Sequence, residues 1–337
     1  MDLQKISHYQ ILRPLGAGGM GAVFLAEDTR LDRHVAIKFL PSALSSDEKA
    51  KAQLICEARS AAKLDHPNIC CIYEAIEEEP TCIVMEYVEG ETLSDKIRRH
   101  PLMTTEAIDL VIQVADALEE VHSCGMIHRD IKPDNVIVTP RGRVKLLDFG
   151  LAKMVHQPKG DTEKTGSQKP MSKDGSIAGT VAYMSPEQAT GGPVGPRSDI
   201  FSLGTVLYEC LTGRRPFCGT TAMEMRANVI FANPPPPSDF KRGLPPELDR
   251  IILKMLAKKT EARYQSAGKL IQDLRSVRAK LPEVHFSRVD FNFQESASAD
   301  TTISTVQEKK LRRPFVFPSA FFTRACSRIG QALSLLL

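Results

Sequence analysis

The chain has 337 residues, of which 42% are hydrophobic and 25% are charged. This composition is close to the average for soluble domains and predicts a globular protein with about two core-bearing units. The formal net charge of +3 is mild and argues against a nucleic-acid binder with a broad basic face.

The N-terminal residues 1–5 lack the apolar core of a signal peptide. No run of about 18 apolar residues free of charge occurs, so the sequence predicts no membrane span. The eight cysteines form no C-x-x-C pair, and several lie in apolar runs. We therefore expect a cytoplasmic protein whose thiols are reduced.

Short apolar runs alternate with Gly-rich or charged turns between Tyr9 and Leu40, which predicts antiparallel strands. Gly16, Gly18 and Gly21 form a G-x-G-x-x-G pattern. A strand rather than a helix is expected after it, so the pattern is predicted to be the tip of a hairpin. Glycines there allow backbone N–H groups to approach phosphate oxygens, although a plain glycine hairpin is the alternative.

Lys38 is the only charged residue in the apolar run 35–40. A lysine is rarely buried without a partner. The run 52–64 has apolar residues at helical spacing, and Glu57 shares their side. We expect Glu57 to pair with Lys38 and to direct its ammonium at phosphates; the alternative is an ordinary solvated glutamate.

The run 82–90 reads as a buried strand followed by a polar link. Backbone groups of Glu86 to Val88 could bind an adenine ring, and Met85 would line the same pocket. As a bare pattern, the run indicates no more than a buried strand.

The run 128–135 (His-Arg-Asp-Ile-Lys-Pro-Asp-Asn) is followed by Asp148-Phe149-Gly150. Phosphoryl transfer needs an aimed nucleophile and neutralised phosphate charge. Asp130 would accept the proton of a hydroxyl, and Lys132 would lie against the transferred group. Asn135 and Asp148 would hold Mg²⁺. An exposed polar loop is the alternative reading, which the length of the motif disfavours.

In order along the chain, these motifs resemble the eukaryotic-like (Hanks-type) Ser/Thr protein kinases, and the bacterial branch in particular. The resemblance covers roughly residues 9–280 and extends to Ser185-Pro186-Glu187, Asp199 and Arg263. It implies an α+β bilobal fold: a small antiparallel lobe of five strands and one helix (about 9–88) and a larger, mainly helical lobe (about 89–280). Ser185 replaces the usual Ala, which leaves a Glu187–Arg263 pair in place.

The resemblance also implies the site. The catalytic residues would be Asp130, Lys132, Lys38 and Glu57, and the metal ligands Asn135 and Asp148. The ATP-binding residues would be Leu15, Gly16, Ala17, Gly18, Gly19, Met20, Gly21, Val23, Ala36, Lys38, Glu86 and Val88. The activity implied is transfer of the ATP γ-phosphate, with Mg²⁺, to protein Ser or Thr hydroxyls in signal transduction.

The segment 156–176 is poor in large apolar residues and rich in Lys, Gly, Ser and Thr. It predicts a mobile activation segment that is phosphorylated in trans by a second copy, with Arg129 pairing with the phosphate. Soluble linker hydroxyls are the alternative. The candidate hydroxyls are those of Thr162, Thr165, Ser167, Ser172 and Ser176.

Four further helices are expected, at 105–122, 199–211, 248–256 and 268–281. The prolines at 234–237 are expected to be a rigid connector rather than a ligand for another domain. Residues 282–314 are expected to be a flexible basic linker and 315–337 an amphipathic helix. That helix would lie on the inner membrane surface or dock on a protein; a truncated span is less favoured.

Two other functions compete with an active protein kinase. One is a non-catalytic scaffold of the same fold, which the intact Lys38, Asp130 and Asp148 disfavour. The other is a small-molecule phosphotransferase. Thr180 and the Ser-Pro-Glu segment suit a protein substrate better.

Overall fold

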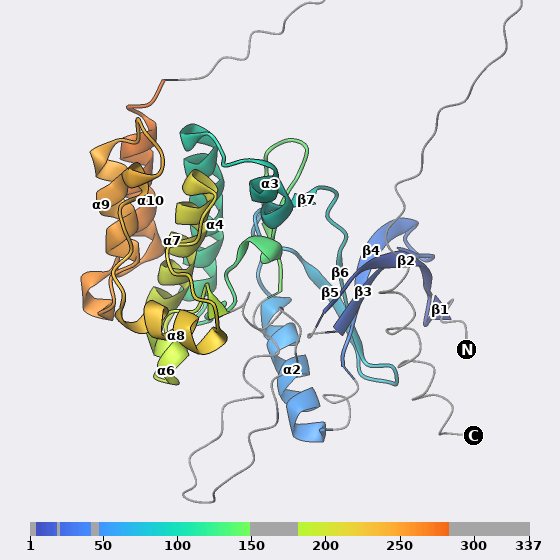
Figure 1. The fold of residues 1–337 in the computed structure, drawn as a ribbon. Helices are drawn as coiled ribbons and strands as arrows, with labels where there is room; N and C mark the ends of the chain where they lie inside the picture. Colours follow the sequence, from blue (N-terminus) through green and yellow to red (C-terminus); the bar gives the residue numbers. More distant parts are fainter. Residues whose placement is uncertain (1–4, 19–20, 42–46, 149–180, 283–337) are drawn as a thin grey trace, which may run out of the picture. The chain divides into compact units, whose positions relative to one another are not determined.

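The computed structural model describes residues 5–18, 21–41, 47–148 and 181–282, which belong to one compact unit of the chain (Figure 1). The predictions made for the activation segment beyond Asp148, for Thr180, and for the linker and helix after residue 282 lie outside the described residues. No helix of the described ranges is both long and apolar enough to cross a membrane. Seven of the cysteines lie in these ranges, and all seven are free thiols.

The N-terminal part is an antiparallel sheet with the strand order β1-β2-β3-β4-β6-β5. The prediction of antiparallel strands between residues 9 and 40 is confirmed. The sheet has one strand more than expected, because the two-residue β1 pairs with the start of β2, and two residues are too few for a periodic signal. The strands are β1 (Lys5–Ile6), β2 (Tyr9–Gly18), β3 (Gly21–Asp28), β4 (Arg33–Phe39), β5 (Ile72–Ile76) and β6 (Cys82–Glu86).

Strands β4 and β6 are buried on both faces. Val35 and Ile37 of β4 contribute to one apolar cluster, whereas Ala36 between them contributes to another. Successive side chains of a strand point to opposite faces, which explains this alternation. The cluster that contains Ala36 continues into the helical part. The sheet and the helices therefore share one apolar core.

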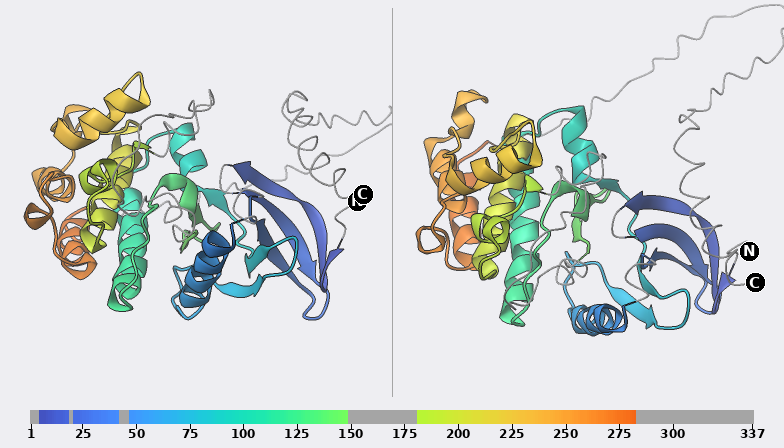
Figure 2. Two further views of the ribbon diagram at one scale, coloured as in Figure 1. Left: turned by 90° about the horizontal axis from the view of Figure 1, so that it is seen from below. Right: turned by 60° about the horizontal axis from the view of Figure 1, so that its bottom comes forward.

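Helix α2 (Glu48–Ala61) begins at Asp47, whose carboxylate accepts hydrogen bonds from the backbone N–H groups of Lys49 and Ala50. Its buried face includes Leu54 and Ala58, which join the shared core. Figures 1 and 2 show α2 beside the sheet. Among the described residues of the small lobe, α2 is the one helix, as the resemblance implied.

The remaining part is mainly helical. Four of its helices match the predicted ones: α4 (Thr104–Ser123), α7 (Pro196–Thr212), α9 (Pro246–Met255) and α10 (Ala267–Arg278). The other α-helices of the described residues are α3 (Leu93–Arg99), α6 (Pro186–Thr190) and α8 (Ala222–Phe231). A small sheet of β7 (Glu91–Thr92), β8 (Val136–Val138) and β9 (Val144–Leu146) lies at the catalytic motif. The α+β fold with an antiparallel sheet followed by helices is confirmed.

Helix α8 was not predicted, and its sequence explains why. It buries Met225 and Val229 but exposes Met223 and Phe231, so its apolar residues form no single stripe. The four prolines lie between α8 and α9, where a short 3-10 turn begins at the last of them.

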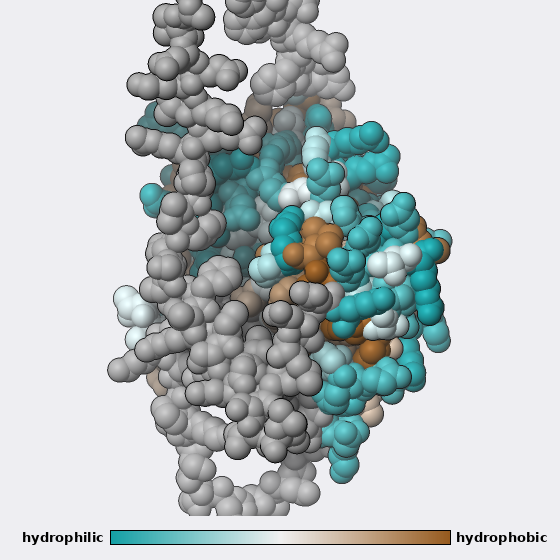
Figure 3. All heavy atoms as spheres, turned by 90° about the vertical axis from the view of Figure 1, so that its right-hand side faces the viewer, coloured by the Kyte–Doolittle hydropathy of each residue, from teal (hydrophilic) through white to brown (hydrophobic). Residues whose placement is uncertain are grey.

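The face shown in Figure 3 carries apolar side chains only as small groups among hydrophilic ones. Among the described residues of the sheet and its turns, the exposed large apolar residues are Leu12, Leu15, Leu31 and Tyr73. Scattered exposed apolar side chains are ordinary on a protein surface.

Candidate active site

The catalytic motif lies between α4 and β8, and its backbone is fixed by a buried carboxylate. Asp199 of α7 accepts hydrogen bonds from the backbone N–H groups of His128 (2.9 Å) and Arg129 (2.8 Å). Arg129 itself has the left-handed backbone angle φ of +67°. Such a conformation is costly for a residue with a side chain and persists only where its surroundings enforce it.

Three predicted site residues meet directly. The Lys132 ammonium lies 2.9 Å from Asp130 Oδ2, and the Asn135 amide donates to the same oxygen (3.0 Å) and to the Asp130 carbonyl (2.8 Å). Asp130 is buried, with 4% of its surface exposed. These contacts fix the orientation of the carboxylate that would receive a hydroxyl proton.

The sheet reaches this group through Lys38. Its ammonium lies 2.6 Å from Asp148 Oδ2. Lys38 was predicted to bind phosphates and Asp148 to bind the metal ion. Lys38 is 8% exposed and pairs with Val23 and Ile83 in the sheet register. Asp148 follows β9, and the neighbouring Leu147 N–H donates to the Asn135 carbonyl. The side chains at 38, 130, 132, 135 and 148 are therefore brought together.

The predicted ion pair between Lys38 and Glu57 is not formed in the part of the chain that the structure describes. Among the described residues, Lys38 forms its ion pair with Asp148. Glu57 is half-buried on α2, and burial raises the pKa of its carboxyl group, while Gln53 and the charge of Arg129 oppose that rise. The Lys38 ammonium instead lies 2.6 Å from the Asp148 carboxylate.

His128 is fully buried and holds two backbone segments together. Its Nδ1 accepts from the Asp130 N–H (3.3 Å), and its Nε2 donates to the Leu147 carbonyl (2.9 Å). Burial lowers the pKa of this imidazole. A neutral ring with the proton on Nε2 satisfies both bonds.

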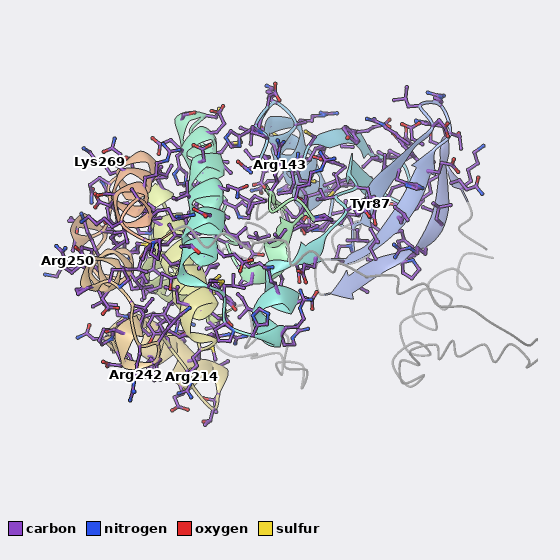
Figure 4. All side chains as sticks on the ribbon, turned by 90° about the horizontal axis from the view of Figure 1, so that it is seen from above. Tyr87, Arg143, Arg214, Arg242, Arg250 and Lys269 are labelled. Atoms are coloured by element: carbon purple, nitrogen blue, oxygen red, sulfur yellow. The ribbon has the colours of Figure 1, made fainter. Side chains whose placement is uncertain are left out.

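An apolar surface adjoins these polar groups. Val23, Ala36 and Val88 belong to or pack on the shared core, together with Met85 and Leu147. The Glu86 N–H is used within the protein by the Cys71 carbonyl. The Glu86 carbonyl oxygen has a long contact of 3.5 Å with the Cys70 thiol. An adenine ring could therefore bind this oxygen or the backbone groups of residues 87 and 88. Figure 4 labels Tyr87 at this link, between the sheet and the helices.

The glycine hairpin forms as predicted, with Gly18 paired to Gly21 across β2 and β3. Gly21 has φ of +113°, and a Cβ there would lie 1.9 Å from the Phe39 carbonyl oxygen. Gly16 is different, because a Cβ there would meet no atom within 4 Å. Gly21 is thus required by the fold, whereas the fold leaves room for a side chain at Gly16.

The predicted Glu187–Arg263 pair is present as a two-bond contact of 2.7 and 2.8 Å. The Arg263 side chain is fully buried. The pair and the Ser198 hydroxyl lower the pKa of the Glu187 carboxyl group, against the effect of burial. This contact ties α6 to the segment before α10.

Two residues near the site escaped the sequence reasoning. Lys145 donates to Glu86 Oε2 (2.8 Å) and to the Ile69 carbonyl (3.2 Å). The Gln188 amide donates to the Arg129 carbonyl (2.8 Å). Both join chain segments that are far apart in sequence, and no local pattern signals such a contact.

A buried carboxylate held by a lysine and an amide, beside a lysine–aspartate pair and a glycine hairpin, is the arrangement of a protein kinase. The comparisons agree: residues 9–274 match the model of the protein kinase domain, and the chain belongs to this family.

The relatives are bacterial. The serine/threonine-protein kinase PrkC of Bacillus subtilis is 37% identical over 90% of this chain and 45% of its own length. PknB of Mycobacterium leprae is 39% identical over 81% of this chain and 43% of its own length. The chain thus spans less than half the length of these curated relatives. The solved PknI kinase domain of Mycobacterium tuberculosis superposes with a TM-score of 0.64, at 26% identity over 82% of this chain and 97% of that one.

Proposed function

We propose that the chain is a serine/threonine protein kinase that transfers the γ-phosphate of ATP to protein hydroxyls. The observation that carries the proposal is the 2.6 Å contact between Lys38 and Asp148, which brings the sheet to the loop that holds Asp130. Its match to a protein kinase domain and the serine/threonine kinases among its relatives support the same reading.

In this proposal Asp130 orients the substrate hydroxyl and takes its proton, and Lys132 stabilises the charge on the transferred phosphoryl group. The glycine hairpin, from Leu15 through Gly21, covers the phosphates. Val23, Ala36 and Val88 hold the adenine ring. Transfer then depends mainly on positioning and charge neutralisation, as phosphoryl transfer requires.

The donor set fits Mg²⁺. Asn135 uses its amide nitrogen for Asp130, which leaves its Oδ1 for a cation. Asp148 holds Lys38 through Oδ2 and keeps a second carboxylate oxygen. Mg²⁺ prefers such oxygen ligands together with substrate phosphates. When bound, the ion would neutralise phosphate charge.

Glu57 has a defined part in the proposal. A cation held by Asp148 would weaken its contact with Lys38, and the Lys38 ammonium would then gain from another carboxylate. Glu57 is half-buried and has its pKa raised by that burial, so its ionised form would gain from a lysine partner.

The proposal is tested with the full chain, Mg²⁺, radiolabelled ATP and casein as acceptor. We expect labelled phosphoserine or phosphothreonine from wild type and loss of at least about 10³-fold in rate for Asp130→Asn, because the proton acceptor is removed. Lys38→Met should lose a similar amount. Lys49→Met, which removes an exposed lysine of α2, is the matched control. Near-normal turnover by Asp130→Asn would contradict the assignment.

The same assay separates the competing functions. A scaffold would bind ATP without transferring phosphate, and a small-molecule phosphotransferase would leave casein unlabelled. Under the proposal the partners are protein substrates and a second copy that phosphorylates residues 156–176 in trans. Mass spectrometry after incubation with Mg-ATP should find phosphate there, and phosphatase treatment should lower activity.

The tail is proposed to contact either the inner membrane surface or a protein. Its basic and apolar residues between 309 and 337 support a surface contact. Flotation with anionic liposomes should recover the intact chain but not a chain ending at Pro282. Equal recovery of the two would remove the membrane reading.

A further inference from the structure

Gln188 uses both ends of its side-chain amide. It is the third residue of α6, and its Oε1 accepts from the Ser185 backbone N–H at 2.9 Å. In return, Ser185 Oγ accepts from the Gln188 backbone N–H at 3.3 Å, which closes a capping box at the start of the helix. The capping box needs only the oxygen of the amide.

The nitrogen of the same amide leaves the helix and reaches the catalytic motif. Gln188 Nε2 donates to the backbone carbonyl of Arg129 at 2.8 Å. Arg129 is the residue with the left-handed backbone, directly before Asp130. Asp199 binds its N–H at 2.8 Å, so the two peptide groups of this residue are held from opposite ends by different helices, α7 and α6.

This arrangement has a specific consequence for Asp130. A residue in a costly backbone conformation keeps it only while its surroundings enforce it. The carbonyl of Arg129 belongs to the peptide group that carries the Asp130 nitrogen, so rotation of that peptide would turn the Asp130 side chain. The bond from Gln188 to the Arg129 carbonyl therefore restrains the direction of the Asp130 carboxylate more directly than the bond from the Arg129 N–H to Asp199 does.

We infer that Gln188 is a positioning residue for phosphoryl transfer, which holds the Arg129–Asp130 peptide in place and links α6 to the catalytic carboxylate. The inference rests on the proposed kinase activity. It assigns Gln188 a role separate from helix capping, because the two jobs use different atoms of its amide. These contacts involve none of the residues proposed to bind ATP, so ATP binding should not depend on Gln188.

The substitution Gln188→Glu separates the two jobs. A glutamate keeps the size and the oxygen that caps α6, but its ionised carboxylate cannot donate to the Arg129 carbonyl and repels it. Ser185→Ala is the matched control, since it removes the hydroxyl of the capping box and leaves the Gln188 amide. The full chain is assayed at pH 8 with Mg-ATP and casein for kcat, for the KM of ATP and for the melting midpoint.

We expect kcat of Gln188→Glu to fall about tenfold, since small misplacements of a catalytic group have effects of this order or larger. The KM of ATP should stay within about twofold of wild type and Gln188→Glu should remain folded at the assay temperature, while Ser185→Ala keeps kcat within about twofold.

Three results would overturn the inference: an unchanged kcat in Gln188→Glu, an equal loss in Ser185→Ala, or a loss of kcat that is matched by unfolding of the variant at the assay temperature or by an equal rise in the KM of ATP. Failure of the wild type to label casein would instead contradict the proposed function, so the two failures are distinguishable.

Discussion

At the scale of single residues, the catalytic motif is stabilised by groups that must keep one protonation state. His128 is the clearest case, because it is fully buried and both ring nitrogens are engaged with backbone groups. A proton added to Nδ1 would face the Asp130 N–H and break that bond. Burial accordingly lowers the pKa of the ring.

The lowered pKa of His128 predicts a loss of stability in mild acid. The folded pKa lies below the unfolded value of about 6.5, so below that pH the unfolded chain binds a proton that the folded chain does not, and stability falls as the pH falls. Between pH 7.5 and 5.5 this contributes about 1 kcal/mol. His128→Phe should be less stable at every pH but should show a shallower decline of its melting midpoint.

Thermal melts from pH 7.5 to 5.5 check this prediction. His100→Phe, at an exposed histidine, is the control and should keep the wild-type slope. An identical slope in His128→Phe and wild type would show that the fold does not depend on the neutral form of His128.

At the scale of elements, the end of β6 and the start of the Asp148 segment are joined by one ion pair. Lys145 of β9 contacts the Glu86 carboxylate at 2.8 Å, and the Cys71 N–H donates to the same oxygen at 3.2 Å. The residues proposed to bind adenine lie at the end of β6 and just after it, and the proposed metal ligand Asp148 lies two residues after the end of β9. The Lys145–Glu86 ion pair thus fixes the position of the proposed adenine-binding link relative to the proposed metal ligand Asp148.

Lys145→Met should therefore weaken ATP binding. Without the Lys145 ammonium, the link after β6 is less fixed. Loss of a part-buried ion pair costs about 1 kcal/mol of binding free energy. We therefore expect the KM of ATP to rise about threefold to tenfold, while kcat changes by less than about twofold. Steady-state kinetics with varied ATP measures both constants.

Lys269→Met is the matched control, because this lysine is exposed on α10 and Figure 4 shows it on the helical side, away from Tyr87. A fall in kcat at constant KM in Lys145→Met would assign the pair to catalysis instead.

At the scale of the whole described unit, stability depends on a buried guanidinium that joins distant segments. Arg263 donates to both oxygens of Glu187 and to the carbonyls of Arg197, Ala257 and Lys258. Its contacts satisfy the donors of a side chain with no exposed surface. Removing one partner of such a pair leaves an unpaired buried charge.

Arg263→Met should cost about 3–5 kcal/mol of unfolding free energy, because Glu187 and three carbonyls lose their donor. Urea unfolding followed by circular dichroism measures the loss, and Arg275→Met at an exposed position of α10 should cost less than about 0.5 kcal/mol. A loss below about 1 kcal/mol in Arg263→Met would mean that packing replaces the ion pair.

Local patterns predicted most of this architecture. The strands between 9 and 40, the hairpin at the glycines and the four long helices have clear periods, and the catalytic motif is contiguous in sequence. What escaped prediction lacks a period or spans the chain: β1 is too short, α8 has no apolar stripe, and Lys145 and Gln188 bind backbone carbonyls more than fifty residues away in sequence. In the structure Lys38 pairs with Asp148 rather than with the predicted Glu57, because no local pattern ranks two carboxylates that lie far apart in sequence.

The alternation along β4 has a final consequence. Because Ala36 and Lys38 share one face and Val35 and Ile37 share the other, the register of β4 decides whether the Lys38 ammonium or an apolar side chain faces Asp148. Deleting one residue from the 29–32 turn leaves the length of β4 intact but threatens a shift by one step. Such a shift would turn the Lys38 ammonium into the apolar cluster of Val35 and Ile37. The burial of β4 on both faces therefore fixes the position of this single charge.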